Sequence, residues 1–159
     1  MKTIKRLSLI ISIFCFLPVV NGNAQEIGKY IEQFEGQFGA RTFKIKVLRI
    51  GEKSNEEVLI QVSGVDDPID GHIYKYKKEW QSSEKRFNKY KYATTQVPDK
   101  EKFSLLHSDD YYGSQIFKVY LLDTPMEAIE IYPMAYQEDL DPNFMYQQYL
   151  TQQKELNKK

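Results

Sequence analysis

Between residues 43 and 131 the chain repeatedly alternates apolar and polar residues, and this period of two constrains the fold more than any other feature. Phe43, Ile45 and Val47 alternate with Lys44 and Lys46. Because successive side chains of a strand point to opposite faces of a sheet, such alternation is typical of a strand that buries one face. We therefore expect the middle of the chain to form antiparallel sheet.

The same alternation predicts six further strands, at residues 58–62, 74–76, 90–92, 103–105, 117–121 and 129–131. The segment between the first two strands, from Gly51 to Asn55, is short and polar, which predicts a hairpin that makes these strands antiparallel neighbours. Later turns are indicated by Pro98, Gly113 and Pro125.

A helix is predicted at each end of this strand region. Ile27, Ile31, Phe34 and Phe38 recur at spacings of four, three and four, which is the pattern of an amphipathic helix, and Gly39 is a suitable left-handed terminator.

Near the other end, Asp141 followed by Pro142 predicts the start of a helix that runs to about Leu156. Its apolar residues become sparse toward the end, so the chain is expected to fray from about residue 152.

These elements predict an α+β fold, in which the N-terminal amphipathic helix packs on a roughly seven-stranded antiparallel meander sheet and a C-terminal helix follows. The alternative architecture is a small closed or half-closed β-barrel. The length of the chain suits a single domain over residues 25–159.

Residues 1–24 have the profile of a cleavable signal peptide. Lys2, Lys5 and Arg6 precede an apolar run of about 14 residues, and the small residues Gly22 and Ala24 predict cleavage before Gln25. The run is shorter than the roughly 20 residues that a membrane-spanning helix needs, so no integral membrane span is expected after cleavage. The protein is predicted to be exported, and to be periplasmic or secreted.

Cys15, the single cysteine, lies inside this apolar run. A lipoprotein signal is the competing interpretation, but Cys15 follows the bulky Phe14 rather than a small residue. After cleavage the domain would be free of cysteine and stabilised by its core alone, which suits a bacterial envelope better than a disulfide-rich secreted scaffold.

The charge of the predicted mature domain favours no strongly charged partner. Loss of Lys2, Lys5 and Arg6 leaves 19 basic against 22 acidic residues, a net charge of −3. Nucleic acid is not an expected partner, because binding it requires a clearly basic face. The one local candidate is a basic run that alternates with tyrosines and is interpreted as a solvated face: Lys75, Lys77, Lys78, Lys85, Arg86, Lys89 and Lys91.

Two groups of residues invite a metal interpretation, but their spacing does not support it. Asp66, Asp67 and Asp70 resemble the start of a calcium loop, although Pro68 and Lys77 occupy positions where such a loop needs oxygen ligands. A tight turn explains these residues better. The two histidines, His72 and His107, are predicted on separate strands and have no required carboxylate partner. No metal or cofactor is therefore predicted.

A hydrolase is the least supported of the functions considered. Ser104, Ser108, His107 and Asp109 are close in sequence, but no glycine-flanked nucleophile turn accompanies them. An odd separation also predicts that Ser104 and His107 point to opposite faces of a strand.

The aromatic content is the most unusual feature of the composition, with 12 tyrosines, 9 phenylalanines and 1 tryptophan. Four tyrosines on two neighbouring strands, with Trp80 in the loop between them, are predicted to form a cross-strand binding face: Tyr74, Tyr76, Trp80, Tyr90 and Tyr92. The competing interpretation is that these rings belong to the core.

Three functions follow from these features. The first is an exported, non-catalytic binding module of the bacterial envelope, similar to an inhibitor or immunity factor, that recognises a protein partner through the tyrosine-rich face. The second is a small lipid or glycan carrier that uses the same aromatics, and the third is a small hydrolase.

Overall fold

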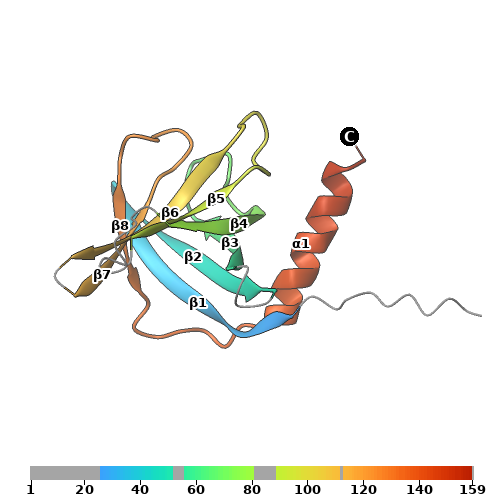
Figure 1. Cartoon of the computed structure of the whole chain (residues 1–159), viewed down its shortest axis with the longest axis horizontal. Coiled ribbons are helices and arrows are strands. Elements are labelled where there is room, and N and C mark those ends of the chain that lie inside the picture. Colours follow the sequence, from blue (N-terminus) through green and yellow to red (C-terminus); the bar gives the residue numbers. More distant parts are fainter. Residues whose placement is uncertain (1–25, 52–55, 81–88, 112, 159) are drawn as a thin grey trace, which may run out of the picture.

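The chain forms an eight-stranded antiparallel barrel with one helix packed on its outside (Figure 1). The computed structural model describes residues 26–51, 56–80, 89–111 and 113–158. The predicted signal peptide therefore lies outside the described residues. The elements are β1 (Ile27–Phe38), β2 (Arg41–Ile50), β3 (Glu57–Ser63), β4 (Ile73–Trp80), β5 (Tyr90–Thr94), β6 (Phe103–Tyr111), β7 (Ser114–Val119), β8 (Ile129–Pro133) and α1 (Pro142–Leu156).

Each strand pairs antiparallel with the next one in sequence, and β8 pairs with β1 to close the barrel. All seven strands predicted from the alternation are present, and the predicted pairing of β2 with β3 is confirmed. The α+β meander with an N-terminal helix is wrong, and the closed barrel, which was the alternative, fits the structure.

The predicted N-terminal helix is the strand β1. Its apolar residues mimic a helical stripe because β1 is buried on both faces. Phe34 belongs to the cluster inside the barrel, whereas Ile31, three residues away and so on the opposite face, belongs to a cluster between the barrel and α1. Gly39, expected to end the helix, has a positive φ of 61° in the turn that joins β1 to β2.

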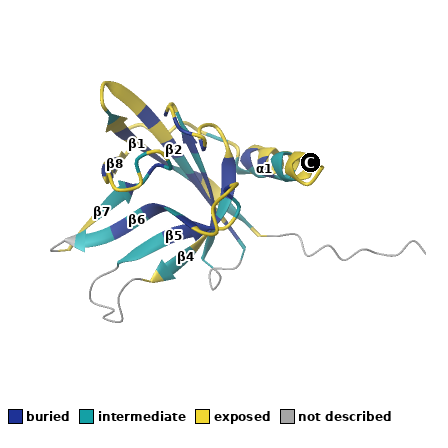
Figure 2. Cartoon of the chain, turned by 90° about the horizontal axis from the view of Figure 1, so that it is seen from above, coloured by how far each residue is buried: buried dark blue, intermediate teal, exposed yellow. Residues whose placement is uncertain are grey.

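Two hydrophobic clusters hold the fold together. The larger one fills the barrel, where an eight-stranded barrel is just wide enough for side chains to meet. The smaller one lies between the outer surface of β1 to β4 and α1, and its buried members are Ile31, Leu48, Ile50, Leu59, Ile73, Met145 and Tyr149. Figure 2 shows the helix nearly end-on, with its exposed side turned away from the barrel.

The helix α1 starts as the sequence predicts. Asp141 caps it by accepting a hydrogen bond from the backbone N–H of Asn143, and Pro142 occupies the first turn. Gln152, where fraying is predicted to begin, hydrogen-bonds both backbone groups of Ile73 at 2.9 Å. The helix continues to Leu156, and fraying beyond Gln152 stays a prediction.

The two ends of the barrel differ in chemistry. Successive connections of an up-and-down barrel alternate between its ends, so the β1–β2, β3–β4, β5–β6 and β7–β8 connections share one end. Three of these connections contribute buried apolar residues that plug this end, namely Val65, Ile69, Val97 and Leu121. The opposite end, where β4 ends and β5 begins, carries charged and aromatic side chains instead.

Candidate functional site

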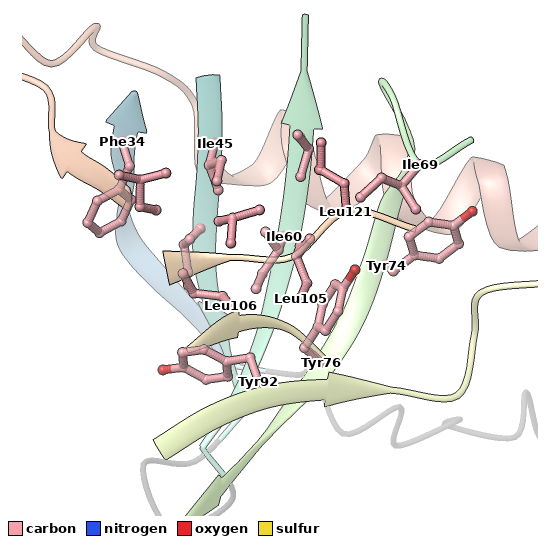
Figure 3. Close-up of a cluster of buried hydrophobic side chains, with 14 of the residues drawn as sticks. Phe34, Ile45, Ile60, Ile69, Tyr74, Tyr76, Tyr92, Leu105, Leu106 and Leu121 are labelled. Carbon is pink, nitrogen blue, oxygen red and sulfur yellow. The ribbon is translucent and has the colours of Figure 1, made fainter. Parts of the chain in front are cut away.

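The five residues predicted to form a binding face occupy three different environments. Tyr74, Tyr76 and Tyr92 are buried, and their rings lie among the aliphatic side chains of the barrel interior (Figure 3). Tyr90 is half-buried at the edge of that cluster, and Trp80 is 57% exposed. The structure therefore brings the rings together on one continuous face of β4 and β5, but only its end reaches solvent.

The buried tyrosines behave as core residues. Tyr76 is 1% exposed, and its burial raises the pKa of its hydroxyl far above the usual value. Burial likewise raises the pKa of Tyr92, with a smaller contribution from the neighbouring Tyr90. A partner cannot contact the ring of Tyr76 without opening the barrel.

Where the tyrosine face reaches solvent, it ends in a ladder of aromatic rings. Trp80 was predicted in the loop between two strands, but it is the last residue of β4. It lies opposite Tyr90 in the β4–β5 ladder, and their ring centroids are 5.7 Å apart at an angle of 70°. The rings of Tyr90 and Tyr92 are 5.5 Å apart at 78°. These edge-to-face contacts are favourable, so they fix the orientation of each ring.

Lys78 stabilises the exposed end of this ladder. Its Nζ atom lies 4.1 Å from the ring centroid of Trp80, 4.2 Å from that of Tyr90 and 3.2 Å from Oε1 of Glu56. The side chain of Lys78 is only 14% exposed, so these cation–π and ionic contacts are partly shielded from water. Lys78 therefore holds the indole of Trp80 against the barrel.

A hydrogen-bonded group holds Tyr90 from the other side. The side-chain amide of Gln115 donates to the hydroxyl of Tyr90 at 3.1 Å and to the hydroxyl of Ser108 at 2.7 Å. Ser108 is buried on β6, and Gln115 lies on β7. The position of Tyr90 on β5 is thus fixed by Trp80 of β4 on one side and by Gln115 of β7, which is bonded to Ser108 of β6, on the other.

A second ion pair lies at the same end of the barrel. Nε of Arg49 donates a hydrogen bond of 3.1 Å to Oε1 of Glu32. We call the side chains at this end the mouth surface, and its members are Glu32, Arg49, Glu56, Lys78, Trp80, Tyr90 and Tyr92.

Two hollows open beside the mouth surface, and both are lined by Arg49 and Gly51. One, of about 270 Å³, is also lined by Glu56, Lys78 and Tyr92. The other, of about 350 Å³, lies along β1 and is also lined by Tyr30 and Glu32, among others. Arg49 therefore stands between them.

Arg49, Glu32, Glu56 and Gln115 were not singled out from the sequence. Each is a single polar residue in or beside a strand, and such residues are common on solvated surfaces. The sequence could have indicated the side on which Arg49 lies, because Arg49 continues the alternation of Phe43, Ile45 and Val47 and so shares their face of β2. Sequence alone does not say which strand ends meet when the barrel closes.

The acidic loop 66–70 is a turn, as predicted. The carboxylate of Asp70 accepts hydrogen bonds from the backbone N–H groups of Gly64 and Val65, at 2.7 and 3.1 Å. The carboxylate of Asp67 accepts from Ile69 within the loop and from Asp123 on the β7–β8 connection. These oxygens serve the backbone at the plugged end of the barrel. No group of three or more potential metal-binding His, Cys, Asp or Glu side chains occurs in the described parts of the chain.

The prediction that Ser104 and His107 point to opposite faces of a strand is wrong. A register shift occurs where β6 pairs with Tyr92 and Ala93, and Leu105 and Leu106 are both buried in the barrel cluster. This bulge restores Ser104 and His107 to the same, outer side of β6. The ring of His107 lies 4.5 Å from that of Tyr120, and partial burial and the nearby Lys91 lower its pKa.

Within the described residues, no helix has both the length and the apolar character to cross a membrane. Comparisons of the chain with models of known protein families, with curated proteins and with solved structures find no match.

Proposed function

We propose that this protein is an exported, non-catalytic binding module of the bacterial envelope that recognises a protein partner through its mouth surface. The observation that carries the proposal is Trp80, a large apolar ring that is 57% exposed and yet held in place by Tyr90 and Lys78. An inhibitor or an immunity factor is one form that such a module takes.

The composition of the mouth surface supports a protein partner. Tryptophan, tyrosine and arginine are the residues most enriched among those that dominate binding energy in protein interfaces, and Trp80, Tyr90 and Arg49 meet here. Because contacts within the barrel already orient Trp80 and Tyr90, little side-chain freedom is left to lose on binding. The buried Tyr74, Tyr76 and Tyr92 act in this proposal as support for the exposed rings.

A lipid or glycan carrier has less support. Such a protein encloses its ligand in a mostly apolar cavity. The interior of this barrel is occupied by side chains, including Phe43, Ile45, Leu105 and Tyr76. Half of the residues that line each hollow at the mouth surface are charged. A hydrolase also has less support, because Ser104 and His107 share a face but form no hydrogen bond with each other in the described part of the chain.

Export is part of the proposal and rests on the sequence of residues 1–24, where the basic start and the short apolar run precede Gly22 and Ala24.

The test of recognition is a comparison of Trp80→Ala with the parent protein in affinity capture from an envelope extract of the source bacterium. We expect the truncation to weaken capture of a specific protein by roughly thirtyfold, as for a hot-spot residue worth about 2 kcal/mol. Its free energy of unfolding should change by no more than about 1 kcal/mol, because most of the ring is already in water.

Met126→Ala is the matched control, because Met126 is also a large, exposed apolar residue, at 94% exposed, but lies on the β7–β8 connection at the plugged end. It should capture the same protein as the parent does. Equal capture by Trp80→Ala and the parent would rule out the mouth surface as the site of recognition.

A further inference from the structure

We propose that the protein partner presents an acidic side chain to the mouth surface, and that Arg49 binds its carboxylate. This inference rests on the proposed function and names the chemistry that the same surface recognises. Three observations carry it: the position of Arg49, its unused hydrogen-bonding capacity, and the way the other charges of the mouth surface are paired.

Arg49 is placed where a bound group would meet it. It belongs to the walls of both hollows, so a side chain seated in either one lies within reach of it. Its own side chain is 68% exposed, the largest exposed fraction among the paired charged side chains of the mouth surface. Arg49 thus borders both hollows and is also the most exposed of the four paired charges of the mouth surface.

Arg49 also has donors to spare. A guanidinium has five N–H groups in a planar fork, which matches the two oxygens of a carboxylate. Only Nε is engaged, with Glu32, and within the described residues the two terminal nitrogens have no hydrogen-bond partner. Lys78 differs, because its ammonium is enclosed by Glu56, Trp80 and Tyr90. Of these two cations, Arg49 is the one whose terminal nitrogens are unpaired among the described residues, so it is the one that we expect to bind an anion.

The carboxylates of the mouth surface are already committed to cations of the same chain. Glu32 accepts from Arg49, and Glu56 accepts from Lys78. A cationic group of a partner would have to compete with these pairs. Glu26 and Lys29, which also line the hollow along β1, offset each other in charge. Selectivity for an acid therefore comes from the geometry of the guanidinium rather than from net charge.

The surroundings of Arg49 indicate what should accompany the acid. Tyr92 lines the hollow next to Arg49, and Lys78, which lines the same hollow, touches the exposed ring of Trp80. A partner segment that lays an apolar side chain on Trp80 would bring a nearby residue to Arg49. The recognised sequence is therefore an aspartate or glutamate close to a large apolar residue.

The experiment selects phage-displayed random peptides on the immobilised full domain, and then measures the affinity of the selected peptides for variants. We expect the selected peptides to combine Asp or Glu with an aromatic or large aliphatic residue. Arg49→Gln should weaken their binding by roughly tenfold or more, because a hydrogen-bonded ion pair is lost. Arg49→Lys should restore only part of the affinity, because it keeps the charge without the fork.

Arg41→Gln is the matched control. It removes the same charge from the β1–β2 end of the barrel, away from the mouth surface, and should bind the peptides as the parent does. Replacing the acidic residue of a peptide by its amide tests the same contact on the unaltered protein. It should also weaken binding by roughly tenfold, so the result does not depend on how well Arg49→Gln folds.

The outcomes separate this inference from the proposed function. Peptides that need Trp80 but carry no acid, or that bind Arg49→Gln as well as the parent, would overturn the acidic partner and leave recognition at the mouth surface standing. If the selection yields no peptide, or only peptides whose binding is unaffected by Trp80→Ala, both proposals are overturned.

Discussion

At the residue scale, alternate residues of one strand have different roles because they lie at different depths. Tyr74, Tyr76, Lys78 and Trp80 all lie on the inward-facing side of β4. The first two meet the packed interior, whereas Lys78 and Trp80 lie beyond it and meet water. The residue type alone does not decide whether an aromatic side chain of β4 is buried or exposed, since tyrosine and tryptophan are both amphipathic.

The first stability prediction concerns Tyr76. Tyr76→Ala should lower the free energy of unfolding by about 3–5 kcal/mol, because it leaves a cavity where a large ring was fully buried. Tyr136→Ala is the control, since that ring is exposed and its loss should change stability by less than about 0.5 kcal/mol. Urea denaturation measures both. A loss below about 1 kcal/mol for Tyr76→Ala would contradict its place in the core.

Tyr76 also gives the fold a dependence on alkaline pH. Burial raises the folded-state pKa of Tyr76 above that of the unfolded chain, near about 10. Its contribution is therefore fully present below pH of about 10 and is lost as the pH rises further. Tyr76→Phe, which cannot ionise, should show a shallower loss of stability over this range. Urea denaturation at increasing pH makes the comparison, and equal slopes would contradict the shift.

At the element scale, β1 shows how a strand can imitate a helix. Its residues Ile31 and Phe34 face opposite sides, and both sides are buried because α1 covers the outside of the barrel. Gly36 completes the strand by allowing β1 to approach the ring of Phe43. A Cβ atom at Gly36 would lie 2.6 Å from that ring and 2.8 Å from Ile131.

The prediction at this scale is that Gly36→Ala destabilises the barrel. We expect a loss of about 1–3 kcal/mol, because the added methyl group overpacks a position flanked by two core side chains. Gln37→Ala changes the adjacent, exposed residue of β1 and should have an effect within about 0.5 kcal/mol. Thermal unfolding of the pair measures the difference. Equal melting temperatures would mean that β1 does not pack as closely on Phe43.

At the scale of the whole molecule, the helix and the barrel form one structure rather than a barrel with an appendage. Met145 and Tyr149 are buried against the outside of β1 to β4. Glutamine side chains form hydrogen bonds with backbone groups of β4 in the part that is not paired with β5: Gln96 accepts from the N–H of Lys75, and Gln152 bonds to Ile73. The β4–β5 ladder covers only Lys77–Trp80, and Gln152 of α1 hydrogen-bonds Ile73 beyond it. We therefore expect the helix and barrel to unfold together.

The prediction at this scale uses two neighbouring residues of α1. Met145→Ala should lower the free energy of unfolding by about 2–5 kcal/mol, because it empties part of the cluster between helix and barrel. Phe144→Ala removes a ring that is largely exposed and should cost less than about 1 kcal/mol.

The transitions followed by helical circular dichroism and by tyrosine fluorescence should coincide in both variants, as in a two-state unfolding. Separate transitions in the parent protein would show instead that α1 is held independently of the barrel.

The sequence predicted part of the candidate site. Trp80 and Tyr90 were found because aromatic residues in alternation are conspicuous, and they lie together as expected. Arg49 and Glu56 were not found, because they come from other strands and each is an ordinary charged residue in its local sequence. The register of the paired strands β2 to β5 brings them beside Lys78 and Tyr92.

The sequence by itself determined seven of the eight strands and the start of α1, because alternation and helix capping depend on residues that are close along the chain. The identity of β1, the closure of the barrel and the depth of each tyrosine were decided by the tertiary structure. These properties depend on which surfaces α1 covers and which strand ends meet. A local sequence pattern indicates that a residue is buried, but only the tertiary structure decides which residues it packs against.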